Sequence, residues 1–169
     1  GCQTHQLVFA GVDPETGELS SGFREKGYFQ GAVLNTLALL GWHPSGNKEL
    51  FTLDELIDEF SLDRVGKAGA RFDPEKAKWF NQQYLNKLED DVLMQKVMPQ
   101  LKEHGISADN DYLKKVCGLM KQRLTFVNEF WEHSHYFFTL PDKYDEKMIR
   151  KKWVNNVPGL FAELKTVFL

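Results

Sequence analysis

The sequence has few cysteines and no long apolar run. Cys2 and Cys117 are its only two cysteines in 169 residues, and neither belongs to a Cys-x-x-Cys pair or a Cys/His cluster. Neither a disulfide framework nor a zinc site is therefore expected, and Cys117 is expected to be a small core residue. The longest uncharged apolar stretch, 32–40, is interrupted by Asn35 and Thr36, so we expect no membrane span.

Catalytic signatures are also missing. The chain has no glycine-rich phosphate loop, no Gly-x-Ser-x-Gly elbow and no helical His pair with a catalytic Glu. His133 and His135 are two positions apart and do not share a helix face, so we expect them to end a helix, where its dipole favours positive charge. No catalytic residue, metal site or bound cofactor is therefore predicted for this chain.

The N-terminal segment does not resemble a secretion signal. It lacks a basic start, and its apolar core spans only 7–12. A cytoplasmic protein is therefore expected. The net charge of −3 argues against a surface covered with phosphate-binding residues, but the charges are unevenly placed. Residues 112–128 contain four cations and no acid, whereas acids gather at 54–59 and 89–91.

Helix signals dominate the chain after residue 23. Thr52 and Glu55 form a capping-box pattern, and Asp73 followed by Pro74 is typical of a helix start. The fold class predicted is mainly α, with a short hairpin formed by 7–12 and 19–23 around a turn at 13–17. The expected helices are Tyr28–Leu40, Leu53–Phe60, Pro74–Leu88, Asp90–Glu103 with a bend near Pro99, Asp109–Lys121, Thr125–His133, Asp145–Lys152 and Pro158–Phe168.

One run in the middle of the chain is specific enough to indicate a family. Residues 51–85, FTLDELIDEFSLDRVGKAGARFDPEKAKWFNQQYL, closely resemble the segment that follows the catalytic domain in bacterial glutamyl-tRNA synthetases. The upstream segment 27–42, GYFQGAVLNTLALLGW, agrees with that family, except that Gln30 and Gly31 stand where Pro-Glu is usual. A weaker match extends through 112–123 to the aromatic Tyr136-Phe137-Phe138.

The resemblance implies a division into parts. Residues 1–26 are expected to be a loop or hairpin remnant, 27–88 a helical stem-contact domain, and 89–169 the first helical anticodon-binding domain, an α-helical bundle. The family's His-x-Gly-His and Lys-Leu-Ser-Lys-Arg signatures do not occur. The chain is therefore expected to be an inactive fragment of a parent that ligates L-glutamate to tRNA(Glu) with ATP and Mg²⁺. The partner expected for this chain is tRNA(Glu), and a monomer is expected.

The connector 64–71 is the first candidate for contact with RNA. Two glycines allow the backbone to approach phosphate, and the nearby N-terminus of the Pro74 helix adds partial positive charge. The residues themselves also permit an ordinary solvated loop, and the family resemblance favours phosphate contact. The predicted tRNA-binding residues of this region are Arg64, Lys67, Arg71, Lys76 and Lys78.

The acid-free stretch 112–128 is the second candidate. Helical geometry predicts a buried arc of apolar side chains, with Lys114 and Lys121 on one exposed line opposite to it. Arg123 does not fit that helix, so we expect the helix to end first or the guanidinium to be held specially. The resemblance implies that Arg123 contacts the last anticodon base, and Lys115 and Lys121 are expected to position the RNA backbone.

Two other hypotheses remain open from the residues alone. In the first, the chain is a helical protein-interaction module with no role in nucleic-acid binding, and its basic patches are only solvated faces. In the second, the chain is a complete small enzyme. Binding of tRNA(Glu), titrated with salt, distinguishes the tRNA-binding hypothesis from the interaction module.

Overall fold

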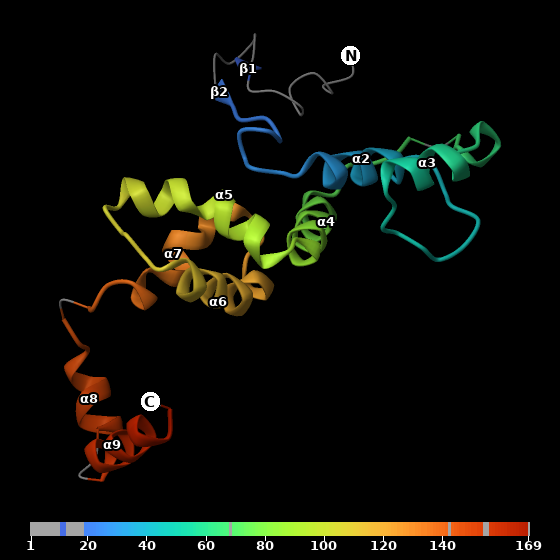
Figure 1. Ribbon diagram of the computed structural model, residues 1–169. Coiled ribbons are helices and arrows are strands. Elements are labelled where there is room, and N and C mark those ends of the chain that lie inside the picture. The colour runs from blue at the N-terminus through green and yellow to red at the C-terminus, as the bar shows by residue number, and fades with distance from the viewer. Residues whose placement is uncertain (1–10, 13–18, 68, 142, 154–155, 169) are drawn as a thin grey trace. The chain divides into compact units, whose positions relative to one another are not determined.

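The structure is a computed structural model that describes residues 11–12, 19–67, 69–141, 143–153 and 156–168. The chain divides into two compact units, Gly1–Phe138 and Thr139–Leu169, which we call unit 1 and unit 2. Among the described residues, no helix is both long enough and apolar enough to span a membrane. The architecture is mainly α, as the sequence predicted (Figure 1).

Unit 1 starts with a short antiparallel ladder. Strand β1 (Gly11–Val12) pairs with β2 (Leu19–Ser20), and Gly11 lies opposite Ser20. This pairing confirms the predicted hairpin at these four positions. The start of the predicted first strand, 7–10, and the turn at 13–17 lie outside the described residues.

Two helices and a tight connection follow. Helix α2 (Gln30–Ala38) leads to Trp42, which forms an isolated antiparallel bridge with Val65. Helix α3 (Leu53–Glu59) begins with the predicted capping box: Thr52 Oγ1 accepts from the Glu55 amide at 3.2 Å, and Glu55 Oε2 accepts from the Thr52 amide at 2.9 Å. The 3-10 helix η1 (Leu62–Arg64) then returns the chain to the Trp42 bridge.

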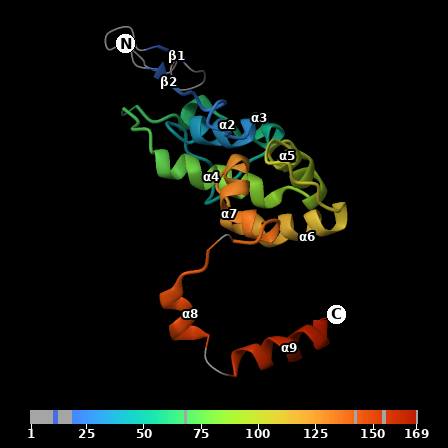
Figure 2. The same cartoon turned by 90° about the vertical axis from the view of Figure 1, so that its left-hand side faces the viewer.

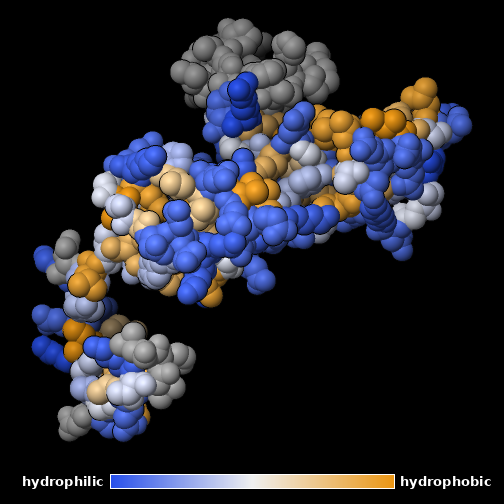
Figure 3. Space-filling view, viewed as in Figure 1, coloured by the Kyte–Doolittle hydropathy of each residue, from blue (hydrophilic) through white to orange (hydrophobic). Residues whose placement is uncertain are grey.

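Most of the apolar side of α3 is not covered. Leu56 is buried, whereas the exposed fractions are 56% for Leu53, 66% for Ile57 and 47% for Phe60. Leu62 in η1 is 79% exposed. Figure 3 shows apolar surface, in orange, at the end of unit 1 that contains α3.

The longest helices come next. Helix α4 (Pro74–Lys87) starts where Asp73 Oδ1 accepts hydrogen bonds from the amides of Glu75 and Lys76. Helix α5 (Asp90–Glu103) has the predicted bounds and contains Pro99. It ends before Gly105, whose φ of 70° is a left-handed conformation that favours glycine.

A small bundle completes unit 1. It contains α6 (Asn110–Met120), η2 (Lys121–Arg123), η3 (Val127–Glu129), α7 (Phe130–Ser134) and η4 (His135–Phe137). Helices α5, α6 and α7 pack together, and both ribbon views show them as neighbours (Figures 1 and 2). The predicted helix 125–133 is thus divided into a 3-10 turn and a short α-helix.

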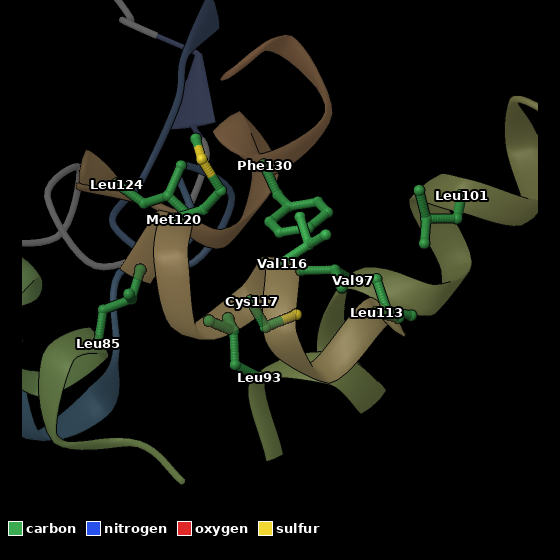
Figure 4. Close-up of a cluster of buried hydrophobic side chains, with 10 residues drawn as sticks. All are labelled: Leu85, Leu93, Val97, Leu101, Leu113, Val116, Cys117, Met120, Leu124 and Phe130. Atoms are coloured by element: carbon green, nitrogen blue, oxygen red, sulfur yellow. The ribbon is translucent and has the colours of Figure 1, made fainter. Parts of the chain in front are cut away.

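The core of the bundle is apolar and continuous with α4. Burial keeps the Cys117 thiol neutral, raising its pKa to about 12, which agrees with the predicted role as a core residue. Figure 4 shows this core from the side of α6. Its buried members are Leu85, Leu93, Val97, Leu101, Leu113, Val116, Cys117, Met120, Leu124 and Phe130.

Two buried asparagines connect elements that are distant in sequence. The Asn35 side chain donates to the Phe51 carbonyl at 2.8 Å and to Tyr84 Oη at 2.7 Å, and accepts from the Phe51 amide at 2.8 Å. Asn81 Oδ1 accepts from the Phe29 amide at 2.7 Å, and its Nδ2 donates to the Thr125 carbonyl at 2.7 Å. These bonds join α2 to α4, and α4 to the loop that follows η2.

Unit 2 is a pair of helices, α8 (Glu146–Lys152) and α9 (Val157–Phe168). Asp145 Oδ1 caps α8 by accepting from the amides of Lys147 and Met148 at 2.8 and 3.2 Å. The rings of Trp153 and Phe161 are stacked, with centroids 5.4 Å apart and an interplanar angle of 20°. This contact joins the end of α8 to α9.

Candidate nucleic-acid interface

The cations of the connector 64–71 have two kinds of environment: one is held by contacts within the protein, and two are exposed and unpaired among the described residues. The Arg64 guanidinium lies over the Trp42 ring at 5.5 Å and donates to the Glu59 carbonyl at 2.5 Å. Its own carbonyl accepts from the His43 amide, and the Gly66 amide donates to the Gly41 carbonyl at 2.7 Å. Arg64 therefore holds the connector against the loop after α2.

Lys67 and Arg71 are placed differently. Both are exposed, and neither side chain has an ion pair or hydrogen bond within the described part of the chain. Arg71 lines a small depression on unit 1 together with Thr36, Asp73 and Lys76. These two cations are free to meet an anion from solution.

Lys76 and Lys78 lie on the first turns of α4 and are both paired at the surface. Lys76 Nζ is 2.7 Å from Glu49 Oε1, and Lys78 Nζ is 2.8 Å from Glu75 Oε1. The hydrogen bond that Lys78 donates to the Glu75 carboxylate raises the pKa of Lys78, so this ammonium stays charged. Exposed pairs of this kind contribute little to stability, and a phosphate group can replace the carboxylate.

The predicted exposed line of Lys114 and Lys121 is wrong in one respect. Lys114 is exposed and lies 2.6 Å from Asp91, but the Lys121 side chain is only 16% exposed. Lys121 Nζ is 2.6 Å from Asp90 Oδ1 and also donates to the Leu88 carbonyl. The acidic N-terminus of α5 packs beside α6 and draws both lysines toward it, so Lys121 joins the α4–α5 junction to α6.

Lys115 and Arg123 remain free. Helix α6 ends at Met120, and η2 carries Arg123, which confirms that the helix ends before this residue. Both side chains are exposed, and in the described residues neither has an ion pair or hydrogen-bond partner. A planar guanidinium in this position has all its donors available for a base edge or a phosphate.

A polar depression lies next to η2, with a volume of about 550 Å³. It is open to solvent and lies among α4, the start of α5 and the end of α6. Its floor includes Asn86, and the Gln82 amide donates to the Gln122 carbonyl at 3.3 Å. The residues that line it are Gln82, Asn86, Asp90, Gly118, Lys121 and Gln122.

The sequence predictions did not include two features of the chain. Asn81 and Asn35 connect the elements that carry the cations, but the partners of Asn81 are 52 and 44 residues away. A second acid-free stretch, 147–162, contains four cations, the same number as 112–128, but no RNA contact was predicted for it. The described residues contain no group of three or more His, Cys, Asp or Glu that could hold a metal ion.

Two family models match this chain. Residues 92–168 match the anticodon binding domain model, which covers α6, η2 and unit 2. Residues 16–79 match the model of the catalytic domain of class I tRNA synthetases (E and Q). The connector, with Lys67 and Arg71, lies in the second of these segments.

Curated relatives agree with both models. The chain is 50% identical to the glutamate–tRNA ligase of Phocaeicola vulgatus over 155 residues, which is 92% of this chain and 31% of that protein. It is 44% identical to the glutamate–tRNA ligase of Bacteroides fragilis over the same shares of the two proteins, 92% and 31%. The chain therefore spans about a third of the length of these relatives.

Solved structures give the same result for the fold. A glutamate tRNA ligase from Elizabethkingia meningosepticum, in complex with its amino acid, superposes with a TM-score of 0.82 and 42% identity over 92% of this chain and 31% of its own. The glutamate-tRNA synthetase of Elizabethkingia anophelis gives a TM-score of 0.76 and 43% identity over 85% and 29%. Over most of its length the chain is therefore similar to one segment of bacterial glutamyl-tRNA synthetases.

Proposed function

We propose that this chain is the tRNA-contacting part of a glutamyl-tRNA synthetase, which recognises the stem and anticodon of tRNA(Glu). The parent ligase would join L-glutamate to that tRNA with ATP. The observation that carries the proposal is the exposed, unpaired Arg123 on η2, in a segment that matches an anticodon binding domain model.

The free cations divide the work of binding. Lys67 and Arg71 on the connector, and Lys115 on α6, are suited to phosphates, which position an RNA without reading its sequence. Arg123 is suited to a base edge, because its planar fork can form two parallel hydrogen bonds. The depression beside η2 leaves room for a base that has been turned out of its stack.

The remaining predicted residues have supporting roles. Lys76 and Lys78 sit in exposed pairs that RNA phosphate can replace, and both extend the surface of Lys67 and Arg71. Arg64 and Lys121 act through the fold, since their charged groups are already held by Trp42 and by Asp90. We infer that they position the connector and η2 rather than touch the RNA.

ATP and Mg²⁺ belong to the ligation step of the proposed parent. The described carboxylates form no cluster that fits Mg²⁺, so no step of the reaction is assigned to residues of this chain. A cytoplasmic, monomeric protein with tRNA(Glu) as its partner completes the proposal. We do not favour an interaction module without a nucleic-acid role, because the two matching family models describe an anticodon binding domain and a tRNA synthetase domain.

A double-mutant cycle between protein and RNA tests the proposal. The affinity of the chain and of its Arg123→Gln variant is measured for tRNA(Glu) and for a tRNA(Glu) whose last anticodon base is changed. Loss of a bidentate base contact is worth about 1–3 kcal/mol, or about 5- to 150-fold in affinity. We expect this loss with the natural tRNA and almost none with the changed tRNA.

The control is Lys26→Gln, which removes an exposed cation outside both candidate surfaces. It should alter neither affinity measurably. If Arg123→Gln weakens the binding of both tRNAs equally, Arg123 contacts phosphate and does not read a base. If it weakens neither, the anticodon-binding role assigned to η2 is wrong.

A further inference from the structure

We propose that helix α8 is a second RNA-binding surface, which binds the phosphate backbone through Lys147 and Lys151. This inference rests on the proposed tRNA-binding function and extends it to unit 2. Nothing in the family resemblance or in the sequence predictions assigned a role to these residues. The surface lies within the segment 92–168 that matches an anticodon binding domain model.

Charge along the sequence is the first argument. Residues 147–162 contain four cations and no acid, in a protein with 24 acids and a net charge of −3. All four cations, Lys147, Arg150, Lys151 and Lys152, fall on α8. A helix with four cations and one acid, Glu146, in an otherwise acidic protein is a local site of positive potential.

Pairing within the protein is the second argument. Arg150 lies 3.5 Å from Glu146, and their side chains are 83% and 82% exposed, so this pair is weak. The side chains of Lys147, Lys151 and Lys152 have no ion pair or hydrogen bond within the described residues. By contrast, Lys114 and Lys121 in the first acid-free stretch are both neutralised by acids of α5.

Helix geometry is the third argument. At 100° per residue, Lys147, Arg150 and Lys151 lie within one arc of about 100°. Ile149 and Trp153 lie on a different side, and the Trp153 ring stacks on Phe161 of α9. Trp153 thus contacts α9, and the charged residues of α8 are all exposed.

Helix capping explains only part of this pattern. Cations in the last turn of a helix interact favourably with its dipole, which accounts for Arg150, Lys151 and Lys152. Lys147 lies in the first turn, where the dipole disfavours a positive charge. The helix dipole therefore does not account for Lys147, which lies one turn from Lys151 on the same side.

Salt titration of tRNA(Glu) binding tests the inference. The variant Lys147→Gln/Lys151→Gln removes two cations from one side of α8 and retains side chains with a similar helix propensity. Each lost phosphate contact reduces the slope of log K against log salt by about 1. We expect the slope to fall in magnitude by about 2, and circular dichroism to show unchanged helix content.

The matched control is Lys26→Gln/Lys102→Gln, which removes the same charge from exposed positions of unit 1. It should leave the slope unchanged. If the original chain binds tRNA(Glu) and both double variants keep its slope, α8 does not contact RNA, while the proposed function stands. If the original chain does not bind tRNA(Glu) at all, the inference falls together with the proposed function.

Anionic lipid is the alternative partner for a basic helix. Vesicles of phosphatidylserine and phosphatidylcholine are therefore titrated with the same three proteins. We expect the Lys147→Gln/Lys151→Gln variant to bind the vesicles no more weakly than the original chain does. If the α8 variant loses vesicle binding and keeps its tRNA slope, α8 is a lipid-binding surface and the inference is overturned.

Discussion

The side-chain amide of Asn81 donates a 2.7 Å hydrogen bond to the carbonyl of Thr125, 44 residues later in the chain. The same buried side chain accepts from the Phe29 amide at 2.7 Å. One residue of α4 thus fixes both the entry to α2 and the loop that follows η2. The position of Arg123 relative to the connector depends on this link.

Replacing Asn81 should destabilise the fold. Asn81→Leu removes the partners of two partly buried backbone groups, and each such loss costs about 1–3 kcal/mol. We expect the free energy of unfolding in urea to fall by about 2–5 kcal/mol. The matched control is Asn86→Leu on the same helix, because Asn86 Oδ1 is buried without a hydrogen-bond partner. That variant should change stability by less than about 0.5 kcal/mol, and equal losses in the two variants would contradict the assignment.

Gly31 should not accept a side chain. A Cβ at this position would lie 2.4 Å from Tyr84 Cε1, and Tyr84 is held by its 2.7 Å hydrogen bond to the Phe51 carbonyl. Gly31→Ala should therefore lower the free energy of unfolding by about 1–3 kcal/mol, the usual cost of overpacking. Gly41→Ala is the control, since no atom lies within 4 Å of its added Cβ.

A cycle with Tyr84→Ala separates the clash from other effects. In that background the space beside Gly31 is empty, so Gly31→Ala should cost much less than in the natural chain. An undiminished cost would show that Tyr84 is not the residue that excludes a side chain.

Replacing Lys121 should lower stability without changing RNA binding, whereas replacing Lys115 should change RNA binding without lowering stability. Lys121→Gln removes the ion pair with Asp90 and the bond to Leu88, so stability should fall by about 1–3 kcal/mol. The salt slope of tRNA(Glu) binding should stay the same. Lys115→Gln should leave stability unchanged and reduce the slope by about 1. The reverse pattern would make Lys121 the RNA contact.

Cys117 should make stability depend on pH in alkaline solution. Burial raises its pKa from the ordinary 9.0 to about 12, so between these values the folded state keeps a proton that the unfolded state loses. This stability is fully present below pH 9 and decreases as pH rises, by up to about 1.4 kcal/mol per pH unit. Urea unfolding of the chain and of Cys117→Ala at pH 8 to 11 should show their difference shrink, and a constant difference would contradict the burial of the thiol.

The features of the fold that could be predicted from the sequence are those set by contacts between residues close together in the chain. The starts of α3, α4 and α8 were predicted because Thr52, Asp73 and Asp145 bond to amides two or three residues away. The roles of Asn81 and Lys121 were not predicted, because their partners come from helices more than 30 residues away. Lys121 also shows that an exposed position on a helical wheel can be covered by a neighbouring helix.

The candidate site shows the same difference between what depends on local sequence and what depends on distant residues. Lys67, Arg71, Lys115 and Arg123 are exposed and have no ion pair or hydrogen bond among the described residues, and their predicted role in RNA binding is still a proposal. The structural use of Arg64 follows from Trp42, which a reading of the connector alone does not include. Basic residues of α8 had the same acid-free signal as 112–128 but no motif to draw attention to them.

The most direct test of the central claim is the affinity of the isolated chain for tRNA(Glu), measured over a series of salt concentrations. Four free cations, with about 0.7–0.9 counterions released per contact, predict a slope of log K against log salt of at least about 3 in magnitude. A slope of that size supports a tRNA-binding surface. Undetectable binding at low salt, or a slope near zero, would contradict it.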